Sequence, residues 1–272
     1  RYVPAASTIG ADAFTYSVSD GNGGSSVANV IVTIRSDFDA DGLPDTVEDN
    51  NGNGVFDAGE TNFADPDTDD DGLVDGAEDA NANRTVDPTE TDPLDADTDN
   101  DALVDGAERN LVGTNPRVGD TDADGLSDGL EDSNADGALD SEESDPLDAD
   151  TDDDGLADGT EDSNQDGNLA LTSGETDPRD PDTDGDQIRD ATERGLSSPE
   201  TLDTDIGLGA FVADVDPNTT TLPFDADSDD DGLQDGMEDV NRNGERASTE
   251  TDPNEVDTDG DAVITNVVLL WT

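Results

Sequence analysis

The chain has 272 residues, and its 75 acidic side chains against 10 basic ones give a formal net charge of −65. Because only 29% of the residues are hydrophobic, the composition is typical of a disordered chain and excludes a conventional core over most of the length. This charge excludes nucleic acid and anionic membrane surfaces as partners and favours cations. The absence of cysteine excludes disulfides, and without cysteine and histidine, zinc sites and histidine-based catalysis are poor candidates.

Residues 1–36 are poor in charge and predict a β-hairpin. Apolar and polar residues alternate with a period of two at 14–18 and again at 28–34, and the intervening turn at 20–24 is rich in glycine. Two strands do not form a stable domain in water, so we expect this segment to be part of a β-sandwich. The sequence of residues 12–24 resembles the last hairpin of the cadherin-like or immunoglobulin-like tandem modules of large bacterial surface proteins.

The sequence from 37 to 261 repeats with an underlying period of 30 residues. The phrase Asp-x-Asp-x-Asp begins each unit, and the phrase Asp-x-Asn-x-Asn/Asp begins 12 residues later in most units. A six-residue linker completes the unit, and its proline favours an extended or turning chain. The first phrase starts at Asp37, Asp67, Asp97, Asp120, Asp150, Asp182, Asp227 and Asp257, and the second starts at Asp49, Asp79, Asp132, Asp162 and Asp239.

Each first phrase opens a 12-residue segment that we name an aspartate loop. In the loop 67–78, carboxylates occupy positions 1, 3, 5, 9 and 12, and glycine occupies position 6. In calcium loops of this pattern, the side chains at 1, 3 and 5, the backbone carbonyl at 7, position 9 through water and a bidentate glutamate at 12 surround the ion. The predicted ligands are Asp37, Asp39, Asp41, Leu43, Asp45 and Glu48; Asp67, Asp69, Asp71, Leu73, Asp75 and Glu78; Asp97, Asp99, Asp101, Leu103, Asp105 and Glu108; Asp120, Asp122, Asp124, Leu126, Asp128 and Glu131; Asp150, Asp152, Asp154, Leu156, Asp158 and Glu161; Asp182, Asp184, Asp186, Ile188, Asp190 and Glu193; Asp227, Asp229, Asp231, Leu233, Asp235 and Glu238; and, in a partial loop, Asp257, Asp259 and Asp261.

Two further features of the aspartate loops carry predictions. Ala102 and Gln187 replace the glycine at position 6 in two of the loops, and we expect those two sites to bind calcium more weakly. Position 7 is aliphatic in every complete aspartate loop. This predicts one buried aliphatic side chain for each loop.

Each second phrase opens a similar segment that we name an asparagine loop, because asparagine stands at its position 3. Amide oxygens coordinate calcium without adding charge, so we predict that these loops also bind calcium while limiting repulsion between adjacent loops. Two are imperfect, because one delays its glutamate to Glu175 and another has Ala247 at position 9. The predicted ligands are Asp49, Asn51, Asn53, Asp57 and Glu60; Asp79, Asn81, Asn83, Asp87 and Glu90; Asp132, Asn134, Asp136, Asp140 and Glu143; Asp162, Asn164, Asp166 and Glu175; and Asp239, Asn241, Asn243 and Glu250.

Successive loops abut directly, as Glu78 followed by Asp79 shows, and this leaves no room for the helices that flank EF-hand loops. Abutting loops followed by Thr-Asp-Pro linkers resemble the thrombospondin type-3 repeat over 37–261, in a cysteine-free, bacterial form. The resemblance implies an irregular calcium-stabilised repeat array with little regular secondary structure. We expect about twelve or more calcium ions, which carry most of the folding free energy.

Two segments do not fit the repeat. Residues 195–226 interrupt it, and we expect a surface insertion that forms a loop or small β excursion packed on the array. The apolar run 262–272 indicates a strand, either the start of another module or a strand that pairs with the hairpin of another copy in head-to-tail fibres. The run is about half of the ~20 residues that a bilayer requires, so no membrane span is predicted. Because no signal peptide precedes Arg1, we expect a piece of a longer precursor.

Together these features predict an extracellular or cell-surface calcium-binding spacer, a stalk or fibre segment between neighbouring modules of the same polypeptide, with no enzymatic activity. Two alternatives stay open. One is an adhesin or matrix protein whose calcium-loaded array binds a partner or carbohydrate, and the other is a calcium reservoir. A spacer should stiffen with calcium and an adhesin should bind a defined partner saturably, whereas a reservoir should do neither.

Overall fold

The computed structural model describes residues 10–34, 36–141, 143–167, 174–258 and 260. The chain divides into two compact units: the first comprises Arg1–Thr98 with Val104–Gly106, and the second comprises Asp99–Leu103 with Ala107–Thr272. The predicted C-terminal strand, 262–272, lies outside the described residues.

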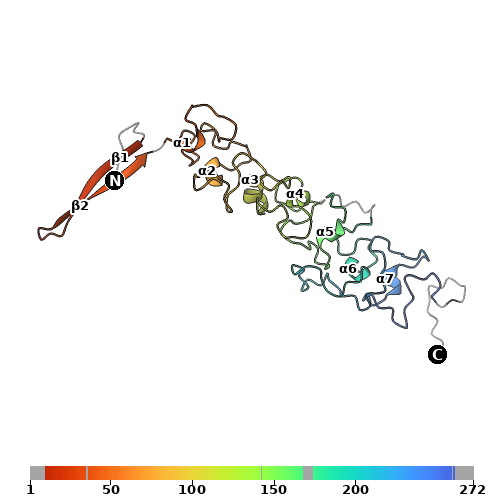
Figure 1. The fold of residues 1–272 in the computed structure, drawn as a ribbon. Coiled ribbons are helices and arrows are strands. Elements are labelled where there is room, and N and C mark those ends of the chain that lie inside the picture. Colours follow the sequence, from red (N-terminus) through yellow and green to blue (C-terminus); the bar gives the residue numbers. More distant parts are fainter. Residues whose placement is uncertain (1–9, 35, 142, 168–173, 259, 261–272) are drawn as a thin grey trace. The chain divides into compact units, whose positions relative to one another are not determined.

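An antiparallel hairpin of β1 (Gly10–Ser19) and β2 (Ser25–Ile34) belongs to the first unit (Figure 1). The register places Phe14 opposite Val30. The carboxylate of Asp20 stabilises the turn by accepting hydrogen bonds from two of its backbone N–H groups, at 2.8 and 2.9 Å. The hairpin predicted from the alternating sequence is therefore confirmed.

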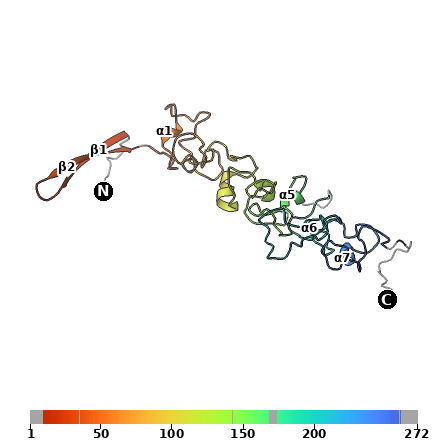
Figure 2. The ribbon, with the colours of Figure 1, turned by 60° about the horizontal axis from the view of Figure 1, so that its bottom comes forward.

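The helices are short turns separated by irregular segments, as Figures 1 and 2 show for α5, α6 and α7 of the second unit. A helical turn begins at position 9 of each complete aspartate loop, after an extended residue such as Val74, and where an asparagine loop follows directly it begins too soon for the helix to propagate. This confirms the predicted irregular fold. The helices are α1 (Asp45–Glu48), α2 (Asp75–Glu78), α3 (Asp105–Ala107), the π-helix η1 (Glu108–Val112), α4 (Asp128–Glu131), α5 (Asp158–Glu161), α6 (Asp190–Glu193) and α7 (Asp235–Glu238).

Left-handed backbone at positions 4 and 6 curls each aspartate loop. In the loop 67–78, Asp70 has a φ of +63° and Gly72 a φ of +99°. The curl turns backbone N–H groups inward, so that Gly72 donates to the carboxylate of Asp67 (3.0 Å). The N–H at position 7 likewise donates to the carboxylate at position 5 (2.6 Å). Aspartate side chains therefore hold the loop from within.

The two loops without glycine at position 6 keep the same turn. Ala102 and Gln187 both have a φ of +87°. A left-handed conformation costs a residue with a Cβ atom about 1–2 kcal/mol. These loops therefore retain the backbone path of the glycine loops under strain.

Aliphatic burial is confined largely to one side chain per loop. The position-7 residues Leu43, Leu73, Leu103, Leu126, Leu156 and Ile188 are buried, and Leu233 is partly buried, which confirms the predicted inward side chains. Buried carboxylates outnumber buried aliphatic residues in the described part of the chain. The interior of this protein is therefore mostly acidic, which is the reverse of an ordinary hydrophobic core.

The insertion 195–226 is a loop that packs on the second unit, without helix or strand. Glu200 N–H donates to the carbonyl of Gly155 (2.9 Å), and Val215 N–H donates to the carbonyl of Asn243 (2.8 Å). The insertion thus contacts loops on both sides of it in the sequence. Within the described residues, no helix has the length and apolar character needed to span a bilayer.

Candidate metal centres

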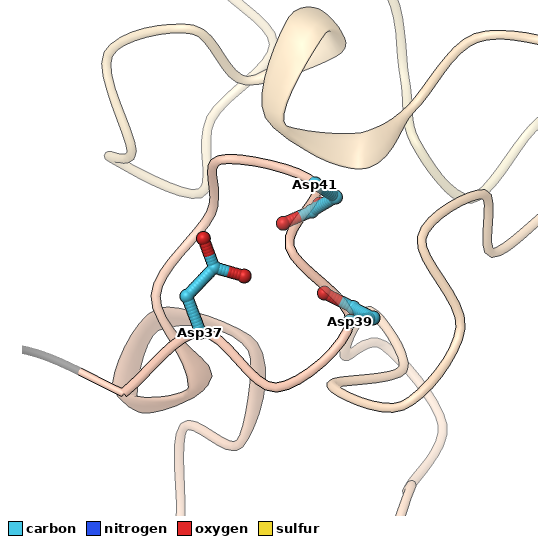
Figure 3. A group of neighbouring side chains, drawn as sticks. All are labelled: Asp37, Asp39 and Asp41. Atoms are coloured by element: carbon cyan, nitrogen blue, oxygen red, sulfur yellow. The ribbon is translucent and has the colours of Figure 1, made fainter.

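The first kind of acidic cluster lies inside a single aspartate loop. Asp37, Asp39 and Asp41, at positions 1, 3 and 5, each contribute a carboxylate oxygen to a group in which these atoms lie within 4.8 Å of one another. Figure 3 shows these three side chains turned toward the interior of the loop. The equivalent residues of the loop 67–78 form the same group. The structure therefore brings together the side chains predicted at positions 1, 3 and 5.

The second kind of cluster joins consecutive aspartate loops. Asp41 and Glu48, at positions 5 and 12 of one loop, meet Asp75, at position 9 of the next aspartate loop, with the contributed oxygens within 4.8 Å of one another. Asp71, Glu78 and Asp105 repeat this arrangement. The prediction assigned position 9 to an ion in its own loop; the structure brings this carboxylate to residues of the preceding aspartate loop, and its assignment to its own loop stays a prediction. We name this group the shared cluster.

A hydroxyl group at position 2 orients the carboxylate at position 9. Thr68 donates to Asp75 through its backbone N–H (2.8 Å) and through its Oγ1 (2.5 Å). The same Oγ1 accepts a hydrogen bond from the N–H of Asn62 in the linker (2.9 Å). The same pair of bonds recurs with Thr98, Thr121, Thr151, Thr183 and Ser228. This hydroxyl was missed in the sequence, although its recurrence is visible there.

A glycine at position 10 lets consecutive loops approach. Gly76 N–H donates to Asp41 Oδ2 (3.0 Å), and a Cβ atom at Gly76 would lie only 2.6 Å from the carbonyl oxygen of Asp41. Equivalent hydrogen bonds and equally close approaches occur at Gly106, Gly159 and Gly236. The first aspartate loop, which has no predecessor, carries Thr46 at this position. Ala191, at the same position of another loop, makes the equivalent bond to Asp154 (2.9 Å), so the small residue serves the contact between loops rather than the helical turn itself.

The glutamate at position 12 is only half satisfied by hydrogen bonds. Glu78 is fully buried, and its Oε1 accepts a hydrogen bond from Thr91 Oγ1 in the linker (3.0 Å). Its Oε2 is buried without a hydrogen-bond donor, and so is Oδ2 of Asp69 at position 3. Glu131 shows the same division, with Ser144 as the donor to one oxygen. A buried oxygen without a donor costs about 1–3 kcal/mol, and more for a charged group, so each such site is suited to a positive partner.

Burial and mutual repulsion make these carboxylates hard to ionise without that partner. Burial, followed by repulsion from Asp69 and Asp71, raises the pKa of Glu78 to about 8. Burial, followed by repulsion from Asp124 and Asp122, raises the pKa of Glu131 to about 10. A divalent cation among these oxygens removes both causes, since it replaces lost hydration and neutralises the charge.

The donor set decides which cation fits. The clusters offer only carboxylate oxygens, which suit hard cations such as calcium and magnesium rather than zinc or copper. Calcium accepts six to eight oxygen ligands in flexible geometry, whereas magnesium demands an octahedron and keeps several waters. Curled loops that crowd three or more carboxylates around one centre therefore fit calcium better.

The asparagine loops bring their predicted residues together around an amide group. Asn81 Nδ2 donates to Asp87 Oδ2 (2.9 Å) and to Glu90 Oε1 (2.8 Å). In the loop 49–60, hydrogen bonds from Asn51 and Asn53 lower the pKa of Asp57, the opposite of the shift at Glu78. The two classes of loop thus differ in electrostatics although their sequences are similar.

Some predicted ligands belong to a loop that the two units share or lie outside the described residues. The loop that begins at Asp97 contributes residues to both units. Residues 168–173, between Asp166 and Glu175, lie outside the described residues, as do Asp259 and Asp261.

Comparisons with known proteins identify only the N-terminal segment. A family model for the bacterial Ig domain matches residues 1–33. No thrombospondin type-3 family model matches the repeats, and no curated protein and no solved structure matches the chain. The hairpin segment is thus similar to part of a bacterial Ig domain, a module typical of surface proteins, and the repeats that follow carry many acidic clusters suited to metal ions.

Proposed function

We propose that this chain is a calcium-binding structural segment of a bacterial surface protein, a stalk or fibre spacer whose folding and stiffness depend on bound calcium. The observation that carries the proposal is the set of buried carboxylate oxygens without donors, such as Glu78 Oε2 and Asp69 Oδ2, at the centres of the clusters. The match of residues 1–33 to a bacterial Ig domain supports a location at the cell surface.

Calcium has to act as the core of such a segment. At the millimolar calcium concentrations outside cells, a site with a dissociation constant of about 10⁻⁴ to 10⁻³ M adds about 0.4 to 1.4 kcal/mol to stability. One site cannot fold the chain, but many sites in series can, because each ion also removes repulsion from its neighbours. The proposal assigns the chain a structural role, without a catalytic step, in the manner implied by the resemblance to thrombospondin type-3 repeats.

Calcium-dependent order tests the proposal. The full chain is dialysed against calcium, against magnesium and against a chelator, and its protease resistance and small-angle scattering profile are compared. We expect calcium alone to give an ordered, resistant chain, since the clusters need six to eight oxygen ligands per ion to be satisfied. Protease resistance that is equal in chelator and in calcium would refute the proposal.

A further inference from the structure

One hydrogen bond recurs in every asparagine loop. The Nδ2 of the asparagine at position 3 donates to Oε1 of the glutamate that closes the loop, across 9 to 11 residues of sequence. The pairs are Asn51 with Glu60, Asn81 with Glu90, Asn134 with Glu143, Asn164 with Glu175 and Asn241 with Glu250. The amide therefore occupies the place in which an ion would contact both residues.

The closing glutamate accepts hydrogen bonds at both oxygens in three of these loops, with Glu90, Glu143 and Glu250, whereas Oε2 of Glu60 is buried without a donor. Oε1 of Glu90 accepts from the backbone N–H and the Nδ2 of Asn81 (3.2 and 2.8 Å), and its Oε2 accepts from the N–H of Asp87 (3.2 Å). The closing glutamate of the preceding aspartate loop, Glu78, has a buried Oε2 without a donor. Adjacent loops of one repeat thus differ in whether a positive partner is still needed.

The asparagine at position 5 cannot simply turn its oxygen inward. Asn83 Oδ1 accepts a hydrogen bond from the N–H of Thr85 (2.7 Å), and its Nδ2 donates to Asp87 Oδ2 (2.8 Å). Turning the amide over would set Nδ2 against this N–H and Oδ1 against a carboxylate, so both bonds would be lost. Asn53 makes the same two bonds with Val55 and Asp57 (2.7 Å each). The hydrogen-bond network thus fixes the amide nitrogen on the inner side.

We propose that the asparagine loops 79–90, 132–143 and 239–250, whose closing glutamates are satisfied at both oxygens, are closed by their amide groups and hold no calcium, so that calcium occupies the aspartate loops and the shared clusters around them. This rests on the proposed function, because it assigns the ions of that function to one class of loop. The amide closes each asparagine loop without adding charge, and Asn81 and Asn83 remain exposed to solvent that screens the remaining carboxylates. The asparagine loops then separate the ion-filled loops along the chain.

The number of calcium ions bound at saturation tests this assignment on the full chain. Equilibrium dialysis with metal analysis is applied to the wild-type chain, to the double variant Asn81→Asp/Asn83→Asp and to the double variant Asn81→Ala/Asn83→Ala. We expect the aspartate variant to gain one ion, because it converts an amide-closed loop into an aspartate loop. We expect the alanine variant to keep the wild-type number.

The matched control is Asp69→Ala/Asp71→Ala in the adjacent aspartate loop, which should lose at least one ion. Loss of an ion from the Asn81→Ala/Asn83→Ala variant would overturn the inference, and so would an aspartate variant that binds more tightly but in unchanged number. A wild-type chain that binds no calcium would instead refute the proposed function.

Discussion

Replacement of Gly76 by alanine separates two explanations of the glycine at position 10. Gly76 is the second residue of α2, and in an ordinary helix alanine is more favourable than glycine by about 1 kcal/mol. Here the new Cβ atom would lie 2.6 Å from the carbonyl oxygen of Asp41 and 2.8 Å from the backbone nitrogen of Leu43. Both contacts are with backbone, so no side chain can rotate away, and we expect Gly76→Ala to be destabilising.

The magnitude follows from the movement that alanine requires. Relief of these contacts needs α2 and the loop 37–48 to separate by roughly 0.5 Å, which stretches the 3.0 Å hydrogen bond from Gly76 N–H to Asp41 Oδ2 and loosens the shared cluster. Overpacking costs about 1–3 kcal/mol and the weakened hydrogen bond about 1 kcal/mol, against a gain of about 1 kcal/mol in helix propensity. The net loss is about 1–3 kcal/mol.

Denaturant unfolding at a fixed calcium concentration measures this loss, and a calcium titration shows whether the affinity of the shared cluster falls with it. The control is Thr46→Ala, at the same position of the first aspartate loop, where the side chain is exposed and no earlier aspartate loop is in contact. We expect that control to lie within about 0.5 kcal/mol of the wild type. A Gly76→Ala chain as stable as the wild type, or more stable, would refute the reasoning.

Two further predictions concern charge. In equilibrium dialysis, Glu78→Gln should reduce the number of bound calcium ions by one, because it removes a carboxylate of the shared cluster. Glu90→Gln should leave the number of bound ions unchanged, because both oxygens of Glu90 are already hydrogen-bonded. Equal losses of calcium from the two variants would contradict this prediction. In chelator, the pKa of Glu78 is raised from its ordinary value of 4.5 to about 8 in the folded chain, so the folded state holds a proton that the unfolded state releases. The stability of the ion-free fold is therefore greatest below about pH 4.5 and is lost as the pH rises toward 8. The hydrodynamic radius in chelator should grow over this pH range, and excess calcium should abolish the change. A radius that shrinks as the pH rises would contradict the predicted direction of this pH dependence.

The meeting of the side chains at positions 1, 3 and 5 could be predicted because they lie within one 12-residue segment whose curl is determined by local residues such as Gly72. The role of position 9 could not, because Asp75 meets Asp41 and Glu48 only once the register between consecutive loops is known. Signals for that register are present in the sequence. A hydroxyl at position 2 and a small residue at position 10 recur, and both are absent from the first aspartate loop, which has Phe38 and Thr46.

The asparagine loops show a different limit of sequence reasoning. An asparagine offers an oxygen to a cation or two N–H groups to carboxylates, and spacing alone does not decide between them. The orientation of the Asn83 amide is determined by the backbone N–H of Thr85, which donates a hydrogen bond to the amide oxygen of Asn83. Backbone geometry around the side chain, rather than residue type, therefore determines which end of the amide faces inward.

The shared cluster gives the array a direction. Asp75 completes the group begun by Asp41 and Glu48, and Asp105 completes the group begun by Asp71 and Glu78, so each loop is finished by its successor and finishes its predecessor. An array of this kind has one fewer shared cluster than it has repeats. A repeat can be added or removed in the middle without leaving a shared cluster incomplete, because any following repeat supplies the same carboxylate. The length of such an array can therefore change in whole repeats, while the first aspartate loop is free to lack the hydroxyl group and the small residue, glycine or alanine, that every later complete aspartate loop carries at positions 2 and 10.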